Sequence, residues 1–136
     1  MINFVISEFS EINSRYGNDV GDLILLETVK TLQKNFPNSN IYRTGSDEFI
    51  VVTEEADSTA GFGNVINNVN IAHAALLSVH ETDVGSVQAE YKIAAAKKSG
   101  TYRSSIISTL KEMTNRTGVA VFGQVQYVDL DLQNKD

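Results

Sequence analysis

Hydrophobic residues in the first third of the chain alternate between a short β-branched run and stretches with helical spacing. The run from Ile2 to Ile6 is short and apolar, which predicts a buried strand close to the first residue. Residues 7–16 keep apolar side chains at helical spacing and precede Gly17, which predicts a short helix ended by a glycine. We expect a second helix with Asp22 as its N-cap. Its apolar face is made by Leu25, Val29, Leu32 and Phe36.

Two β-rich runs, 41–43 and 49–53, flank residues 44–47 and predict a β-hairpin. Gly45 stands at the first central position of the turn, so we expect a type II′ turn with a positive φ at this glycine. The later elements are predicted as a helix over 59–77, a loop or small hairpin over 78–85, a strand over 87–97, a helix over 102–116 and a strand over 119–128.

The predicted order of elements is strand, helix, helix, hairpin, helix, strand, helix, strand. A central hairpin implies antiparallel pairing, and the helices between the other strands should cover the sheet. We therefore expect an α/β fold of the α+β sandwich type, with a central mixed sheet of about five strands. The length of 136 residues fits one domain, which we place at residues 1–132, with a polar tail at 133–136.

Composition narrows the classes of function. The chain has no cysteine, which excludes thiol catalysis and cysteine-ligated zinc and leads us to expect a cytoplasmic protein. No window approaches about 18 uninterrupted apolar residues, so we expect no membrane partner. The formal net charge of −6 argues against a duplex nucleic acid partner, because phosphate binding needs a cationic face.

Two segments carry the candidate chemistry. The first, residues 9–22, reads FSEINSRYGNDVGD, and the second, residues 42–49, reads YRTGSDEF. Together they resemble the GGDEF family of diguanylate cyclases, whose motifs are F-K-x-I-N-D-x-Y-G-H-x-x-G-D and R-x-G-G-D-E-F. The second motif is GSDEF here, so the chain is similar to a divergent member. The resemblance is specific over residues 4–53 and implies the family's nucleotide-cyclase-like palm fold.

The resemblance implies nucleotide-binding residues where the first motif matches. Asn13 and Asp22 fall on the family's guanine-recognising asparagine and aspartate, and Phe9 belongs to the same motif. A carboxylate can accept the adjacent N1–H and N2–H donors of guanine, which adenine lacks, and an amide offers both a donor and an acceptor. Without the resemblance, Asp22 would be interpreted as a helix cap and Asn13 as a turn former, so both interpretations stay open.

The hairpin carries the acidic residues. Asp47 lies on the family's metal-binding position and Glu48 on the following acid, so the resemblance implies that both are catalytic. Asp47 and the backbone carbonyl of Ile6 would hold Mg²⁺, and Gly45 and Ser46 would lie against the phosphates. The side chain of Ser46 can crowd a phosphate or donate its hydroxyl to it. The alternative for the acidic pair is a solvated hairpin corner.

The first predicted strand departs from the family. Val5 stands at the position of the family's first metal-binding aspartate, and a valine cannot hold Mg²⁺. Ser7 takes the place of the nearby second aspartate, and Glu8 should point to the other side of the strand. The family's late lysine and arginine run offers only Arg116 here. We still expect Asp47 to lie beside Ser7 and Glu8, because the hairpin should pair with the first strand.

Three functions stay open. The first is a degenerate GGDEF domain, non-catalytic or weakly active, which binds a guanine nucleotide as a regulatory module in cyclic dinucleotide signalling. The second is an active diguanylate cyclase, or a related cyclic dinucleotide synthase, that uses GTP and Mg²⁺. The third is a dimerisation or adaptor scaffold, with a homodimer or a signalling protein as its partner. We favour the first, and with it a protein that is not an enzyme.

Overall fold

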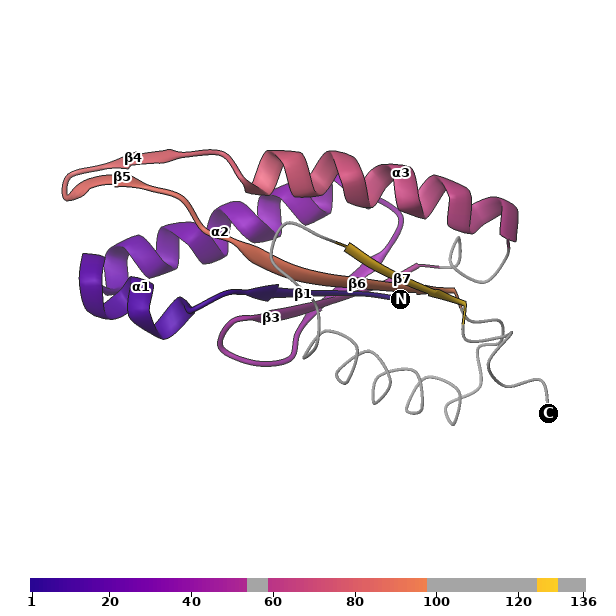
Figure 1. The fold of residues 1–136 in the computed structure, drawn as a ribbon, viewed down its shortest axis with the longest axis horizontal. Coiled ribbons are helices and arrows are strands. Elements are labelled where there is room, and N and C mark those ends of the chain that lie inside the picture. Colours follow the sequence, from indigo (N-terminus) through magenta and orange to yellow (C-terminus); the bar gives the residue numbers. More distant parts are fainter. Residues whose placement is uncertain (54–58, 98–124, 130–136) are drawn as a thin grey trace.

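The computed structural model describes residues 1–53, 59–97 and 125–129, and these contain a five-stranded mixed sheet (Figure 1). The strand order is β2-β3-β1-β6-β7, in which β6 and β7 are parallel and all other neighbours are antiparallel. This sheet confirms the expected α+β sandwich. The strands are β1 (Ile2–Ile6), β2 (Asn40–Arg43), β3 (Glu48–Val52), β6 (Tyr91–Lys97) and β7 (Val125–Asp129).

Three helices lie along one face of the sheet (Figure 1): α1 (Phe9–Tyr16), α2 (Asn18–Asn35) and α3 (Thr59–Leu76). A separate antiparallel ribbon of β4 (His80–Thr82) and β5 (Gly85–Val87) extends beyond the sheet near α1. This ribbon confirms the small hairpin predicted over 78–85. The helix predicted over 102–116 lies outside the described residues. No helix in the described part of the chain has both the length and the apolarity to cross a membrane.

Alternation along β1 divides its side chains between the two faces of the sheet. Ile2, Phe4 and Ile6 are buried in the core under the helices, whereas Asn3 and Val5 face the other way. The core continues along the neighbouring strands with Phe49, Val51, Tyr91, Ile93 and Ala95.

The start of α2 differs from the prediction. The helix begins at Asn18, so Asp22 lies exposed inside it and is not its N-cap. Gly17 is the reason: its φ of 96° reverses the chain, and its N–H donates to the carbonyl of Asn13 at 2.9 Å, so one glycine ends α1 and starts α2. The buried face of α2 is therefore Val20, Ile24, Thr28 and Leu32, with Leu25 and Val29 at its margin.

The strand predicted over 87–97 is divided in the structure. Val87 belongs to β5, where it pairs with His80, and β6 begins only at Tyr91. The side-chain amide of Gln88 donates to the carbonyl of Leu77, which holds the connection against the end of α3. Of the last predicted strand, residues 125–129 are described as β7, and residues 119–124 lie outside the described part.

A buried pair of hydroxyl groups joins α2 to the sheet. Thr28 donates its hydroxyl proton to the carbonyl of Ile24 at 2.7 Å, and its Oγ1 lies 2.7 Å from the Tyr91 hydroxyl. Because Thr28 has one hydroxyl proton, Tyr91 is the donor of the second bond. Burial raises the pKa of Tyr91 above its ordinary value of 10.0, so the phenol stays neutral and able to donate.

Candidate functional site

The loop between β2 and β3 is held by its own neighbours. The N–H of Thr44 donates to the carbonyl of Glu48 at 3.0 Å. Arg43 donates from Nε to the carbonyl of Gly45 at 3.1 Å and from Nη2 to that of Ser46 at 2.7 Å. Three residues, 45–47, thus lie between the last bonded pair, where a type II′ turn would have two. Among the described glycines, Gly17 and Gly85 have a positive φ and Gly45 does not. The prediction of a positive φ at Gly45 is therefore wrong.

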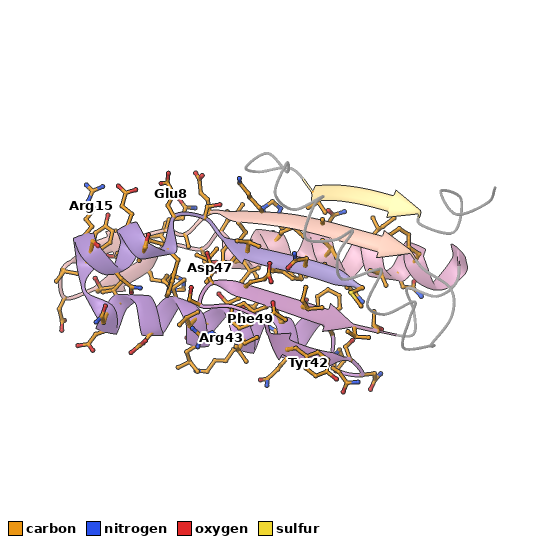
Figure 2. All side chains as sticks on the ribbon, turned by 90° about the horizontal axis from the view of Figure 1, so that it is seen from below. Glu8, Arg15, Tyr42, Arg43, Asp47 and Phe49 are labelled. Atoms are coloured by element: carbon orange, nitrogen blue, oxygen red, sulfur yellow. The ribbon has the colours of Figure 1, made fainter. Side chains whose placement is uncertain are left out.

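The loop is also fixed to the end of β1. The N–H of Ile6 donates to the carbonyl of Asp47 at 2.9 Å, which confirms that Asp47 lies beside Ser7. Figure 2 shows Asp47 between Glu8, on the β1–α1 connection, and Arg43, at the end of β2. Asp47 is half-buried, whereas Gly45 and Ser46 are exposed. The structure therefore brings together the residues predicted for the metal and the phosphates.

The carboxylate of Glu48 is engaged on both oxygens. Oε1 accepts a hydrogen bond from the Thr44 hydroxyl at 2.5 Å, and Oε2 accepts one from the amide of Asn3 at 3.4 Å. Asn3 is fully buried in β1. Glu48 therefore ties the hairpin to the first strand, a role that the sequence alone did not indicate.

A row of three residues crosses the sheet next to this loop. In the β1–β3 register Val5 is opposite Glu48, and in the β1–β6 register Val5 is opposite Lys92. Tyr91 and Ile93 lie in the core, so Lys92 faces the other side of the sheet, together with Val5 and Glu48. Lys92 was missed in the sequence. Because Lys92 lies between two core residues, the alternation along the strand indicates which face of the sheet it is on. Nothing in the sequence indicates the register of β6 against β1.

The predicted guanine-binding residues lie where α1 meets α2. Asn13 is half-buried with its amide against Gly21, where a Cβ atom would lie only 1.7 Å from Oδ1. Phe9 is buried beneath the same contact, and its Cζ would lie 3.3 Å from that Cβ. Asp22 follows Gly21 directly and is exposed. The structure thus brings Asn13, Phe9 and the Gly21–Asp22 step together, and their contact with a nucleotide stays a prediction.

A cleft of about 280 Å³ lies beside the start of α1, and its lining includes Ser7, Glu8, Arg15 and Glu90. Ser7 Oγ is buried and has no hydrogen-bond partner among the described residues. Glu8 has the left-handed backbone conformation, with φ 52° and ψ 41°. The cleft's described lining contains neither Asn13 nor Asp47, although it includes Ser7, which lies beside Asp47.

The end of β1 and the start of β3 offer fewer protein ligands for Mg²⁺ than the family resemblance implies. Mg²⁺ prefers octahedral oxygen ligands with one or two carboxylates. Val5 offers methyl groups, and both oxygens of Glu48 already accept hydrogen bonds. This leaves the Asp47 carboxylate and the Ile6 carbonyl of the predicted ligands. Within residues 1–53, 59–97 and 125–129, no three His, Cys, Asp or Glu side chains gather closely enough to hold a metal ion.

The fold and the two motif segments define a GGDEF-type domain. The family model described as "Diguanylate cyclase, GGDEF domain" matches residues 1–118, and the chain belongs to this family. Among curated proteins, the probable diguanylate cyclase DgcI of Escherichia coli (strain K12) is 37% identical over 51 residues, which cover 36% of this chain. The match spans only 12% of the length of DgcI.

Solved structures share the fold. The GGDEF domain of PA1120 (YfiN or TpbB) from Pseudomonas aeruginosa has a TM-score of 0.73 at 18% identity, with 93% of this chain and 79% of that chain covered. The diguanylate cyclase SiaD of the same species, solved in complex with its activator SiaC, has a TM-score of 0.75 at 11% identity, with 93% and 48% covered. At these identities the likeness shows the fold, and it confirms the expected palm architecture.

Proposed function

We propose that this domain is a degenerate GGDEF module, which binds a guanine nucleotide and does not synthesise a cyclic dinucleotide at a useful rate. The observation that carries the proposal is Val5, which lies directly opposite Glu48 at the end of β1. Nucleotidyl transfer with metal ions needs carboxylates beside the substrate phosphates. The family's aspartate at this position is replaced by a side chain that binds neither a metal nor a proton.

Base recognition is assigned to Asn13 and Asp22. Asp22 is exposed beside the Asn13–Gly21 contact. Because α2 begins at Asn18, the Asp22 carboxylate does not cap the helix, which was the alternative interpretation of this residue. A carboxylate there can accept the two adjacent donors of guanine, and the Asn13 amide can complete the contact. The exposed Gly45–Ser46 backbone would lie against the phosphates, with the serine hydroxyl as a further donor.

The second candidate is an active diguanylate cyclase or a related synthase that uses GTP and Mg²⁺. The hydrogen bond from Ile6 to Asp47 favours it, because it keeps the two remaining predicted metal ligands adjacent. Asp47 and Glu48 would then be the catalytic carboxylates. Accumulation of product would establish this candidate.

The third candidate is a scaffold that binds a second copy of this chain or a signalling protein. Tyr42 is 53% exposed on β2, an outer strand of the described sheet, and is the kind of side chain that a partner would cover. In every case we assign residues 1–132 to one domain, 133–136 to a polar tail, and the protein to the cytoplasm of a bacterium.

Calorimetric titration with GTP and with ATP, each with and without Mg²⁺, separates the three candidates. The proposal predicts binding of GTP that is tighter than binding of ATP, with no product in the recovered sample. A cyclic dinucleotide in the sample would establish the second candidate instead. Absence of binding to either nucleotide would leave the scaffold.

A further inference from the structure

The sheet edge at the end of β1 carries a cation where the family resemblance implies a metal. Lys92 and Glu48 flank Val5 on the same face of the sheet, each directly opposite it in the register. Directly opposed residues on antiparallel strands have Cβ atoms about 4.5–5.5 Å apart, so the lysine stem starts next to the valine methyl groups. Compared with the family pattern, this position loses a negative charge, and the neighbouring strand supplies a positive one.

A second cation lies at the same end of the sheet. Arg43 ends β2, and its guanidinium is fixed on the hairpin loop by bonds to the Gly45 and Ser46 carbonyls. The antiparallel pairing brings the end of β2, the start of β3, the end of β1 and the start of β6 to one edge. Phosphate groups on this loop would therefore lie within about 10 Å, a screening length, of positive charge. The same positive charges oppose the attraction of a divalent cation to the Asp47 and Glu48 carboxylates at this edge.

We propose that Lys92 takes the place of the metal ion and binds the nucleotide phosphates, so that guanine nucleotides bind this domain without a divalent cation. The inference rests on the proposed binding of a guanine nucleotide. Val5, directly opposite Lys92 in the register, offers methyl groups and no metal ligand, and Glu48, held by Thr44 and Asn3, fixes the loop without taking part in metal binding. Lysine serves this purpose because its ammonium is a compact charge with three donors.

Calorimetry with GTP and guanosine tests the role of the lysine. In the native chain we expect GTP to bind more tightly than guanosine, and to bind in EDTA at least as tightly as in Mg²⁺. Lys92→Gln should weaken GTP binding by about 10- to 100-fold, the loss of a hydrogen-bonded charge, and should leave guanosine binding unchanged. Tighter GTP binding in Mg²⁺, or an unchanged ratio of GTP to guanosine affinity in Lys92→Gln, would overturn the proposal.

Lys30→Gln is the matched control, since it makes the same change of charge at an exposed site. Lys30 lies on α2, and its Nζ is 3.8 Å from a carboxylate oxygen of Glu27, three residues earlier. Its substitution should leave both affinities unchanged. Equal losses in the two variants would mean that net charge, and not the place of Lys92, governs binding.

Two titrations without GTP keep this inference distinct from the proposed function. Mn²⁺ added to the ¹⁵N-labelled native chain should not selectively broaden the amides of residues 5–7 and 47–48, and selective broadening there would contradict the proposal. Inorganic tripolyphosphate should shift the amide of Lys92 in the native chain. A shift with tripolyphosphate but no binding of GTP or guanosine would refute guanine recognition alone, and the absence of that shift would refute the phosphate site.

Discussion

Asn13 lies so close to Gly21 that any side chain at position 21 would force the Asn13 side chain to move. A Cβ atom there would lie 1.7 Å from Oδ1 and 2.8 Å from Cγ of the Asn13 side chain. Helices α1 and α2 approach each other at this point, and the amide of Asn13 occupies the space that a side chain at position 21 would need. The glycine therefore sets the position of the amide that we assign to guanine recognition.

Gly21→Ala should displace Asn13 and destabilise the domain. The clash is expected to cost about 1–3 kcal/mol, from which the gain in helix propensity of about 1 kcal/mol is subtracted. Gly63→Ala is the control, because Gly63 lies in α3 with nothing within 4 Å of its Cβ position. That variant should be more stable by about 0.5–1 kcal/mol. Urea unfolding measures both changes.

Asn13→Ala should rescue Gly21→Ala, because it removes the atoms that the new methyl group meets. The rescue appears as a favourable coupling free energy in a double-mutant cycle. If both glycine variants gain stability equally, the contact between Asn13 and Gly21 does not hold in solution.

Asp22→Asn should abolish most of the preference for GTP over ATP. A charged acceptor that faces two donors is worth about 1.5–3 kcal/mol, and the amide cannot accept both. Asp22 is exposed within α2, so the substitution should change the free energy of unfolding by only a few tenths of a kcal/mol. Asp19→Asn, an exposed change on the same helix, should keep the selectivity. Unchanged selectivity in Asp22→Asn would refute its assignment to the base.

Tyr91 should make the domain sensitive to alkaline pH. Burial raises its pKa in the folded state above 10.0, so the unfolded chain loses this proton first as the pH rises. The stabilisation that the raised pKa of Tyr91 gives to the folded domain is fully present below pH 10. It declines as the pH rises from 10 through the folded-state pKa. Tyr91→Phe should cost about 0.5–1.5 kcal/mol at neutral pH, through the lost bond to Thr28, and should flatten this decline. Parallel stability curves for the two proteins would contradict the assignment.

Glu8 is strained, because a non-glycine residue in the left-handed region costs about 1–2 kcal/mol. Glu8→Gly should raise the free energy of unfolding by about 0.5–1 kcal/mol, after the greater chain entropy of glycine is subtracted. Glu11→Gly removes the same charge from inside α1 and should lower the stability by about 1 kcal/mol. Thermal unfolding compares the two, and a loss of stability in Glu8→Gly would mean that the side chain makes compensating contacts.

Local patterns in the sequence predicted much of the fold. The strand 2–6, the hairpin and the helix over 59–77 were each encoded in consecutive residues, and the structure confirms them. The N-cap at Asp22 failed because Gly17 serves two helices at once, so that α2 has no polar cap in the sequence. The II′ turn failed because Arg43 and Thr44 hold a longer loop.

The candidate site was predicted only as far as its motifs reach. Residues 13, 22 and 45–48 could be named because they lie in two short segments that resemble the family. Lys92 could not, since its position next to Val5 depends on the pairing of strands that are far apart in the sequence. The contact between Asn13 and Gly21 likewise depends on how closely two helices approach, which periodicity does not give.

If the proposed function holds, the domain binds a guanine nucleotide without converting it. Liquid chromatography of the purified chain incubated with GTP and either Mg²⁺ or Mn²⁺ tests it most directly, with the protein-bound nucleotide recovered and identified. We predict that GTP is recovered unchanged from the protein, and that Val5→Asp alone does not fully restore synthesis, because Lys92 still occupies the edge of the site. Steady accumulation of cyclic di-GMP by the native chain would contradict the proposed function.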